Sequence, residues 1–261
     1  MSRIQALFKQ NSSKKILNIY CTAGYPKLDS TLEVMRALEA GGADLIELGM
    51  PYSDPLADGE VIQKSGGVAL ANGMTIAKLF EQLKDFRQLV QVPVVLMGYM
   101  NPVLQYGFEA FCQKAAEVGI DGLILPDLPP REFEAHYGPI LKKHGLDFIF
   151  LVTPETAQER VEMLDKLSSG FLYAVSSSST TGHEKDFVLV EQYLSRLQRY
   201  QLKNPVLVGF GIKDKASFEA ATKYTAGAII GSAYIKALTA AEAAGDQDIA
   251  TTTQAFLKTV R

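Results

Sequence analysis

The run from Glu47 to Gly59 places carboxylates where they could act on a substrate. An apolar, strand-like stretch, Ala43–Ile46, ends directly at Glu47, and the loop that follows carries Asp54 and Asp58 among Pro and Gly residues. A carboxylate at the end of an apolar strand is costly to remove from water, so it is seldom there for packing. The alternative is that Glu47 ends its strand in solvent and that both aspartates only form turns.

Glycines at the ends of the last two expected strands are a second signal. The motifs are Gly209-Phe210-Gly211 and Gly231-Ser232, and the strand before them leads into the hydroxyl-rich run Ser176–Gly182. Small residues there let backbone N–H groups approach an anion, and helix N-termini behind them favour negative charge. Glycine also serves tight turns, but its recurrence in consecutive units favours a phosphate site.

The positions of Lys and His argue against other reaction types. No Lys lies at an expected strand end, so a Schiff-base aldolase would lack its nucleophile. His136 and His144 lie on or beside an expected helix, at the surface, and His183 lies in a loop, so no metal site forms with the carboxylates. The serine run likewise lacks a histidine base. What remains is carboxylate acid–base chemistry on a phosphorylated small molecule, without metal or cofactor.

Strands that alternate with amphipathic helices must position these side chains. The expected strands are Ile16–Thr22, Leu45–Leu48, Val94–Met97, Gly122–Leu125, Phe148–Val152, Phe171–Val175, Val206–Val208 and Ala228–Ile230. The amphipathic segments between them are Ser30–Ala40, Ile76–Leu89, Phe108–Glu117, Arg131–His144, Ala157–Leu167, Val188–Arg199 and Lys213–Tyr224. This pattern predicts βαβ units and favours an α/β fold, a (β/α)8 TIM barrel that forms a single domain over residues 1–261. A doubly wound open sheet is the alternative.

Composition limits the functions that the chain can have. The net charge is −3 and no block of Lys and Arg occurs, which argues against nucleic-acid binding. No apolar run approaches the roughly 18 residues that span a bilayer, and Met1–Gln10 is typical of an extra N-terminal amphipathic helix, not of a signal peptide. Cys21 and Cys112 stand far apart beside apolar residues, which predicts buried free thiols in a cytoplasmic protein.

Several motifs resemble those of the tryptophan synthase alpha subunit family. The most specific is the run Glu47–Gly59 with Ile62-Gln63 after it, and the others are Met97–Pro102, Gly122–Pro129, Gly209–Ile212 and Gly231-Ser232. They follow the family's order and cover almost the whole chain. The resemblance implies a (β/α)8 barrel that cleaves indole-3-glycerol phosphate into indole and glyceraldehyde 3-phosphate. It also implies a beta subunit that consumes the indole within an α2β2 heterotetramer.

The resemblance further implies a role for each matching residue. Glu47 would protonate the indole ring carbon and assist the glycerol hydroxyl, Asp58 would accept a hydrogen bond from the indole N–H, and Tyr173 would support Glu47. The residues implied to hold the phosphate are Gly182, Phe210, Gly211, Gly231 and Ser232. Those implied to flank the indole ring are Tyr20, Met97, Tyr99 and Ile124.

Four further residues match segments that close over the substrate or face the partner. Asp54 and Thr181 match mobile active-site segments, and Asn101 and Asp127 match the surface that faces the beta subunit. The alternative for the last two is that they only start a helix and form a turn. The chain departs from the family's usual pattern at Glu60, where Pro is commonest, and at Ser179-Thr180, where Gly and Val are usual.

Two other classes of function remain open from the sequence. One is another phosphate-binding barrel enzyme, such as an isomerase or a lyase that releases indole without a partner. The other is a non-catalytic regulatory subunit that binds a ligand and activates a partner, against which the joint presence of Glu47, Asp58 and Tyr173 argues. An assay of indole release with and without a beta subunit separates these classes.

Overall fold

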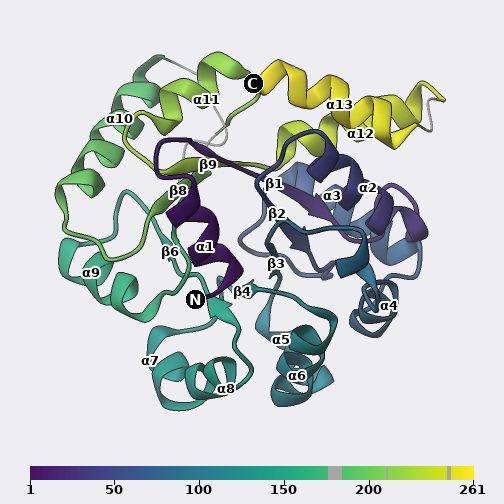
Figure 1. The fold of residues 1–261 in the computed structure, drawn as a ribbon, viewed down its shortest axis with the longest axis horizontal. Coiled ribbons are helices and arrows are strands. Elements are labelled where there is room, and N and C mark those ends of the chain that lie inside the picture. The colour runs from purple at the N-terminus through teal and green to yellow at the C-terminus, as the bar shows by residue number, and fades with distance from the viewer. Residues whose placement is uncertain (176–183, 210, 246–247) are drawn as a thin grey trace.

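Parallel strands alternate with helices along the described chain (Figure 1). A computed structural model describes residues 1–175, 184–209, 211–245 and 248–261. The strands are β1 (Ile16–Thr22), β2 (Leu45–Gly49), β3 (Val94–Met97), β4 (Gly122–Ile124), β5 (Asp147–Phe148), β6 (Leu151–Val152), β7 (Leu172–Val175), β8 (Val206–Gly209) and β9 (Gly227–Ile230). The expected strands are confirmed to within one residue at each end, except that Phe148–Val152 is divided between β5 and β6.

The sheet closes into a barrel through the segment that holds β5 and β6. The hydrogen-bonded order is β5-β4-β3-β2-β1-β9-β8-β7-β6, and only Ile149 and Phe150 separate its two ends along the chain. The Ile149 N–H donates to the Leu123 carbonyl at 3.0 Å, and the Tyr173 N–H donates to the Phe150 carbonyl at 3.0 Å. With β5 and β6 taken as one bent strand, the nine-stranded sheet becomes an eight-stranded barrel. The expected (β/α)8 fold is therefore confirmed, and the open-sheet alternative is wrong.

Alternate side chains of each strand face the barrel interior, as the two-residue period of a strand requires. The apolar side chains that form the lower interior are Ile4, Ile16, Leu45, Val95, Ile124, Ile149, Phe171, Leu207 and Ile229. The strand residues between them belong to a larger apolar layer that packs beneath the surrounding helices. Because both faces of the strands are covered, β1 and β2 are buried at every position.

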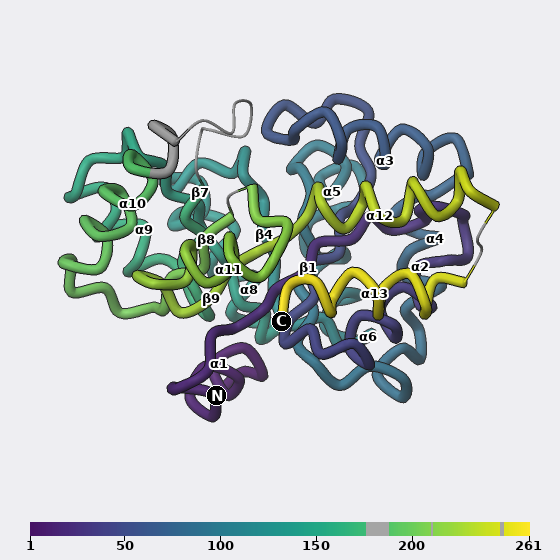
Figure 2. The backbone as a smooth tube through the Cα atoms, turned by 90° about the horizontal axis from the view of Figure 1, so that it is seen from above, coloured from purple at the N-terminus to yellow at the C-terminus, as the bar shows by residue number. Residues whose placement is uncertain are grey.

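The N-terminal helix α1 (Arg3–Gln10) closes one end of the barrel, opposite α3 (Glu60–Ala71) (Figure 2). A capping box starts it: the Ser2 hydroxyl accepts from the Gln5 N–H, and the Gln5 side chain accepts from the Ser2 N–H. Ile4 is fully buried in the lower interior cluster, beside residues that start strands. The expected N-terminal helix is therefore confirmed. Since it fills the barrel at the strand starts, a substrate must enter at the carboxyl ends of the strands.

Helices surround the barrel, and most follow the expected segments. The longer ones are α2 (Thr31–Ala40), α3, α4 (Ile76–Gln82), α5 (Met100–Tyr106), α6 (Phe108–Val118), α8 (Gly138–Lys143), α9 (Gln158–Leu167), α10 (Glu184–Arg199), α11 (Lys215–Thr222), α12 (Ser232–Ala243) and α13 (Ile249–Val260). No helix was predicted for α3, α5, α12 or α13. In α3 the adjacent Gly66 and Gly67 lower helix propensity, so its pattern is weak in sequence.

Two expected helices are shorter than their amphipathic patterns. The segment Arg131–His144 divides into α7 (Pro130–Glu132), a π-helical stretch at Phe133–Tyr137 and α8. Pro139 explains the break, because it has no N–H to donate to the preceding turn of a continuous helix. The segment Ile76–Leu89 ends as α-helix at Gln82 and resumes as a 3-10 turn at Phe86–Gln88. None of the helices in the described ranges is both long enough and apolar enough to cross a membrane.

Candidate active site

Glu47 lies inside the barrel near the carboxyl end of β2, in register with Tyr20 on β1 and Val95 on β3. Only 1% of its surface is exposed, and its Oε2 accepts a hydrogen bond from Asn18 Nδ2 at 3.1 Å. Burial raises the pKa of this carboxyl to about 8, a rise that the Asn18 hydrogen bond reduces and the nearby Asp58 charge increases. Glu47 is therefore mostly protonated at neutral pH and can act as an acid.

Asp58 stands in the loop between β2 and α3, just before Gly59, which precedes the first turn of α3. Its N–H donates to the Pro55 carbonyl at 3.1 Å, and its carbonyl accepts from Gln63 Nε2 at 2.8 Å, so the backbone is held on both sides. Partial burial raises the pKa of its carboxyl to about 6, while a hydrogen bond from Tyr99 lowers it. Asp58 is therefore mostly ionised at pH 7, unlike Glu47.

The phenols of Tyr20 and Tyr173 occupy the barrel interior beside these carboxylates. Burial raises the pKa of both hydroxyls well above the usual value, and the charges of Glu47 and Asp58 raise it further. Glycine on a neighbouring strand makes room for each ring. A Cβ on Gly209 would lie 2.6 Å from Tyr173 Oη, so this glycine, first noted as part of a phosphate motif, is needed for packing.

Apolar and aromatic side chains border the space next to Glu47. Met97 on β3 is half-buried and pairs in register with Gly49 and with Ile124. Ile124 is fully buried in the lower interior cluster, beneath the more exposed Met97. The Tyr99 hydroxyl accepts from the Ala57 N–H at 3.0 Å, which ties the Asp58 loop to the end of β3.

The expected phosphate residues lie after β8 and β9. Gly231 is the N-cap of α12, and Ser232 is its first residue, so free backbone N–H groups of this helix are available to an anion. Gly211 has a φ of +33°, a conformation that favours glycine, and it is exposed like Ser232. Gly182 and Phe210 lie outside the described residues.

The described residues among those expected to close loops or face a partner, Asp54, Asn101 and Asp127, lie at the surface. Asp127 accepts the Met100 N–H with both carboxylate oxygens at 3.0 Å, so it caps the start of α5. Asn101 Nδ2 donates to Tyr52 Oη at 3.1 Å, and the Tyr52 ring lies 5.4 Å from that of Tyr99, centroid to centroid. Asp54 is exposed and accepts a hydrogen bond from the Ser53 hydroxyl. Thr181 lies outside the described residues.

The exposure of one histidine is as expected and that of another is not. His136 is exposed beside Glu132, as expected. His144, expected at the surface, is the C-cap of α8 and has a side chain that is only 14% exposed, with its Nε2 4.0 Å from Glu109 Oε1 on α6. His183 lies outside the described residues. Among the residues that the structure describes, no cluster of His, Cys, Asp and Glu could hold a metal ion.

Asn18, the hydrogen-bond partner of Glu47, was not predicted from the sequence. The signal was present, because Asn18 is a polar residue two positions before Tyr20 in an otherwise apolar strand and therefore faces the same interior. A second polar contact in this region was not predicted either. The Thr22 and Ser65 hydroxyls lie 2.7 Å apart and join β1 to α3.

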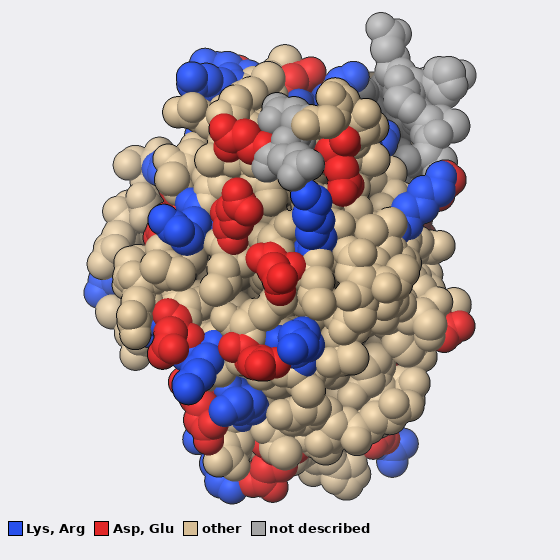
Figure 3. Space-filling model, turned by 90° about the vertical axis from the view of Figure 1, so that its right-hand side faces the viewer, with Lys and Arg blue, Asp and Glu red and all other residues tan. Residues whose placement is uncertain are grey.

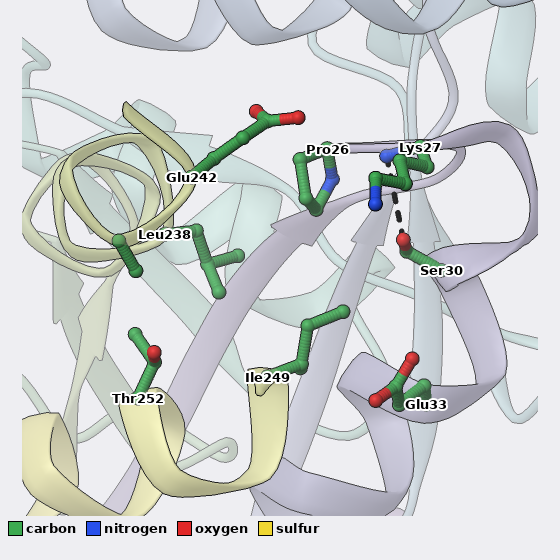
Figure 4. Close-up of a pocket in the computed structure, with 9 residues that line it drawn as sticks. Pro26, Lys27, Ser30, Glu33, Leu238, Glu242, Ile249 and Thr252 are labelled. Carbon is green, nitrogen blue, oxygen red and sulfur yellow. Dashed lines mark hydrogen bonds between the residues drawn. The ribbon is translucent and has the colours of Figure 1, made fainter. Parts of the chain in front are cut away.

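A separate pocket of about 170 Å³ lies on the outside of the barrel. Figure 4 shows it between the loop at Pro26, α12 and α13, with Leu238 and Ile249 among its lining side chains. Figure 3 faces this side of the molecule and shows acidic and basic side chains interspersed over it. None of the expected site residues lines the pocket. It is therefore not the place of the carboxylate chemistry.

Comparisons with known proteins agree with the geometry. The family model described as tryptophan synthase alpha chain matches residues 6–260. The tryptophan synthase alpha chain of Flavobacterium psychrophilum is 52% identical over 240 residues, which is 92% of this chain and 94% of that protein. That of Parabacteroides distasonis is 49% identical over 239 residues, 91% of this chain and 93% of that protein. The crystal structure of tryptophan synthase subunit alpha from Legionella pneumophila superposes with a TM-score of 0.90 at 36% identity, over 100% of this chain and 97% of that one.

Proposed function

The chain belongs to the tryptophan synthase alpha chain family, and on this premise we propose which of its residues carry out the reaction. It is a lyase that cleaves indole-3-glycerol phosphate into indole and glyceraldehyde 3-phosphate, and it passes the indole to a beta subunit. The observation that carries the assignment of roles is the pair Glu47 and Asp58. These carboxyls face one interior space with pKa values of about 8 and about 6.

Glu47 acts first as the acid and then as the base. Protonated at neutral pH, it transfers its proton to the indole ring carbon that bears the glycerol chain. The bond between this carbon and the glycerol carbon then breaks, and its electron pair restores the aromatic indole. The resulting Glu47 carboxylate accepts the proton of the glycerol hydroxyl as that carbon becomes the aldehyde. Glu47 thus ends protonated, ready for the next turnover.

Asp58 stabilises the positive charge that this protonation creates. As a carboxylate it accepts a hydrogen bond from the indole N–H, whose nitrogen becomes cationic once the ring carbon is protonated. Its hydrogen bond with Tyr99 favours the ionised form that this role requires. Because Glu47 is neutral it can act as the acid, and because Asp58 is ionised it can stabilise the cation.

Aromatic and apolar side chains hold the substrate around these two groups. Tyr173 supports Glu47 and the substrate from β7, and the ring of indole lies among Tyr20, Met97, Tyr99 and Ile124. Backbone N–H groups at Gly211, Gly231 and Ser232, together with Gly182 and Phe210, hold the phosphate. The α12 N-terminus adds favourable helix-dipole interaction with its charge. No cofactor or metal takes part in this proposal.

The assembly proposed for this chain is an α2β2 heterotetramer. Asp54, Asn101, Asp127 and Thr181 are proposed to couple loop closure to the beta subunit. Asp54, Asn101 and Asp127 are exposed near the Asp58 loop and the start of α5, which supports this role. We propose that residues 1–261 act as one domain in the cytoplasm, where the buried free thiols of Cys21 and Cys112 would stay reduced.

The experiment that tests this function measures indole. The purified chain is mixed with indole-3-glycerol phosphate, with and without a tryptophan synthase beta subunit. We expect slow release of indole by the chain alone and faster release once the beta subunit is added. Fast release without a partner would indicate an autonomous lyase, and binding without turnover under both conditions would indicate a regulatory subunit.

A further inference from the structure

Asn18 holds the acid–base residue from inside the barrel. It is fully buried on β1, and its Nδ2 donates to Glu47 Oε2 at 3.1 Å. Its strand is paired directly with β2, so the two side chains are fixed by adjacent, hydrogen-bonded backbones. A buried amide at this position is costly unless it is hydrogen-bonded, which makes packing alone a poor reason for Asn18.

The other end of the Asn18 amide has no partner. Its Oδ1 is buried and makes no hydrogen bond among the described residues. Rotation of the amide about its last side-chain bond exchanges the places of Oδ1 and Nδ2. In one orientation the amide donates to an ionised carboxylate, and in the other it accepts from a protonated carboxyl. This rotation breaks no existing hydrogen bond of Oδ1.

The reaction requires both forms of Glu47. The carboxyl gives up its proton to the indole ring and regains one from the glycerol hydroxyl, so each turnover passes through the ionised state. A fixed donor favours the ionised form over the protonated one, and a fixed acceptor favours the protonated form. An amide that can rotate offers a partner to each form.

We propose that Asn18 is a positioning residue that holds the Glu47 carboxyl in place through both of its protonation states. This inference rests on the acid–base role proposed for Glu47. Asn18 does not touch the substrate in this proposal and acts only through Glu47. Its loss therefore changes proton transfer more than substrate binding.

Other titratable groups face Glu47 and must be considered in any pH experiment. They are Asp58 from the β2–α3 loop, Tyr20 from β1 and Tyr173 from β7, while Cys21, on the opposite face of β1 from Tyr20, interacts with the charge of Glu47. Among the described residues, no Lys, Arg or His contributes to the raised pKa of Glu47. Within the part of the chain that the structure describes, only the Asn18 amide lowers this pKa, against burial and the Asp58 charge. Removing its donor should therefore raise the pKa.

The test compares the wild-type chain with Asn18→Leu, which keeps a similar volume but cannot hydrogen-bond. The pKa of Glu47 is read from its carboxyl infrared band across a pH series, assigned by the loss of that band in Glu47→Gln. We expect Asn18→Leu to raise this pKa by about one unit, because the variant loses the hydrogen bond that favours the ionised carboxylate. With beta subunit present, kcat should fall about tenfold and KM should change by less than about twofold.

Two further variants keep the test decisive. Asn18→Ala removes the amide without adding volume or another hydrogen-bonding group, so it replaces Asn18→Leu if that variant does not fold. Ile16→Val, on the same strand, loosens the interior apolar cluster without touching a polar group, and it should leave the Glu47 pKa unchanged. An unchanged pKa and kcat in folded Asn18→Leu, alongside an active wild type, would overturn the inference. A wild-type chain that releases no indole with its partner would instead overturn the proposed function.

Discussion

The phenol of Tyr20 stands in the space that a side chain at Gly49 would fill. A Cβ on Gly49 would lie 2.0 Å from Tyr20 Oη and 2.5 Å from its Cζ. Gly49 ends β2, two residues after Glu47, and it pairs in register with Thr22 at the end of β1. The position of the ring beside the Glu47 carboxyl therefore depends on the absence of a single methyl group on the neighbouring strand.

Gly49→Ala should damage the active site through this contact. The added methyl group must displace the Tyr20 ring, because real Cβ atoms do not approach other atoms so closely. We expect kcat/KM to fall by about 10²-fold, in line with the effect of small misplacements of substrate. The matched control is Gly67→Ala on α3, where a new Cβ meets nothing within 4 Å. Steady-state kinetics of both variants in the presence of the beta subunit checks this, and equal rates would show that the ring can move freely.

Glu47→Gln should abolish indole release and leave the fold intact. The amide cannot exchange a proton, so we expect a loss of about 10²–10⁴-fold in kcat.

The same variant, Glu47→Gln, should also be more stable than the wild type at pH 8. The pKa of Glu47 is raised in the folded chain. Between pH 4.5 and about 8 this carboxyl is therefore ionised in the unfolded chain but protonated in the folded one. The stability of the wild type consequently falls as pH rises through this range.

Chemical denaturation of wild type and Glu47→Gln at pH 5 and pH 8 checks this second effect. We expect the variant to be the more stable protein at pH 8 by about 1–3 kcal/mol, with a smaller difference at pH 5. Near-normal turnover in the folded variant would contradict the mechanism, whatever the stability data show.

Asp58→Asn should slow the reaction strongly without stopping it. The amide oxygen can still accept the indole N–H but carries no charge to stabilise the cation, so we expect kcat to fall by about 10²–10³-fold. Asp85→Asn, which replaces an exposed carboxylate outside the site, is the control. Single-turnover measurements of indole formation compare the two, and a wild-type rate for Asp58→Asn would exclude the charge-stabilising role.

The pH profile of kcat/KM should be bell-shaped, with its optimum near pH 7. Activity should fall as pH rises through about 8, where Glu47 loses its acidic proton, and as pH falls through about 6, where Asp58 becomes neutral. The phosphate of the substrate also titrates near about pH 6. The Asp58→Asn profile separates the two, because its acid limb should persist only if the phosphate causes it.

Asp121→Ala should destabilise the closed end of the barrel. The Asp121 carboxylate is buried before β4 and binds the guanidinium groups of Arg3 and Arg87 and the Val94 N–H. Its removal leaves the half-buried Arg87 without its counter-charge, so we expect a loss of about 3–5 kcal/mol in the free energy of unfolding. Urea denaturation measures this. Glu117→Ala, which breaks an exposed pair with Lys114, should cost less than about 1 kcal/mol.

Local patterns were sufficient to predict most of the fold. The apolar strands and the helices between them depend on periodicity within about a dozen residues, so the (β/α)8 barrel followed from the sequence. The break of the fifth strand at Ile149-Phe150 did not, because it depends on two different neighbouring strands. The weak helix α3 was missed for a related reason, since packing against β1 and α12 overrides its glycines.

The order of residues alone is enough to show which side chains are available to the chemistry. Glu47 at the end of an apolar strand, Asp58 in the loop after it and the paired glycine ends are local features, so they are visible in the order of residues. What those side chains can do depends instead on the folded arrangement around them. Burial and neighbours from other strands set the pKa of Glu47 at about 8 and that of Asp58 at about 6, and they placed Asn18 against Glu47. Desolvation depends on everything that surrounds a group in space, and that arrangement exists only once the barrel has closed.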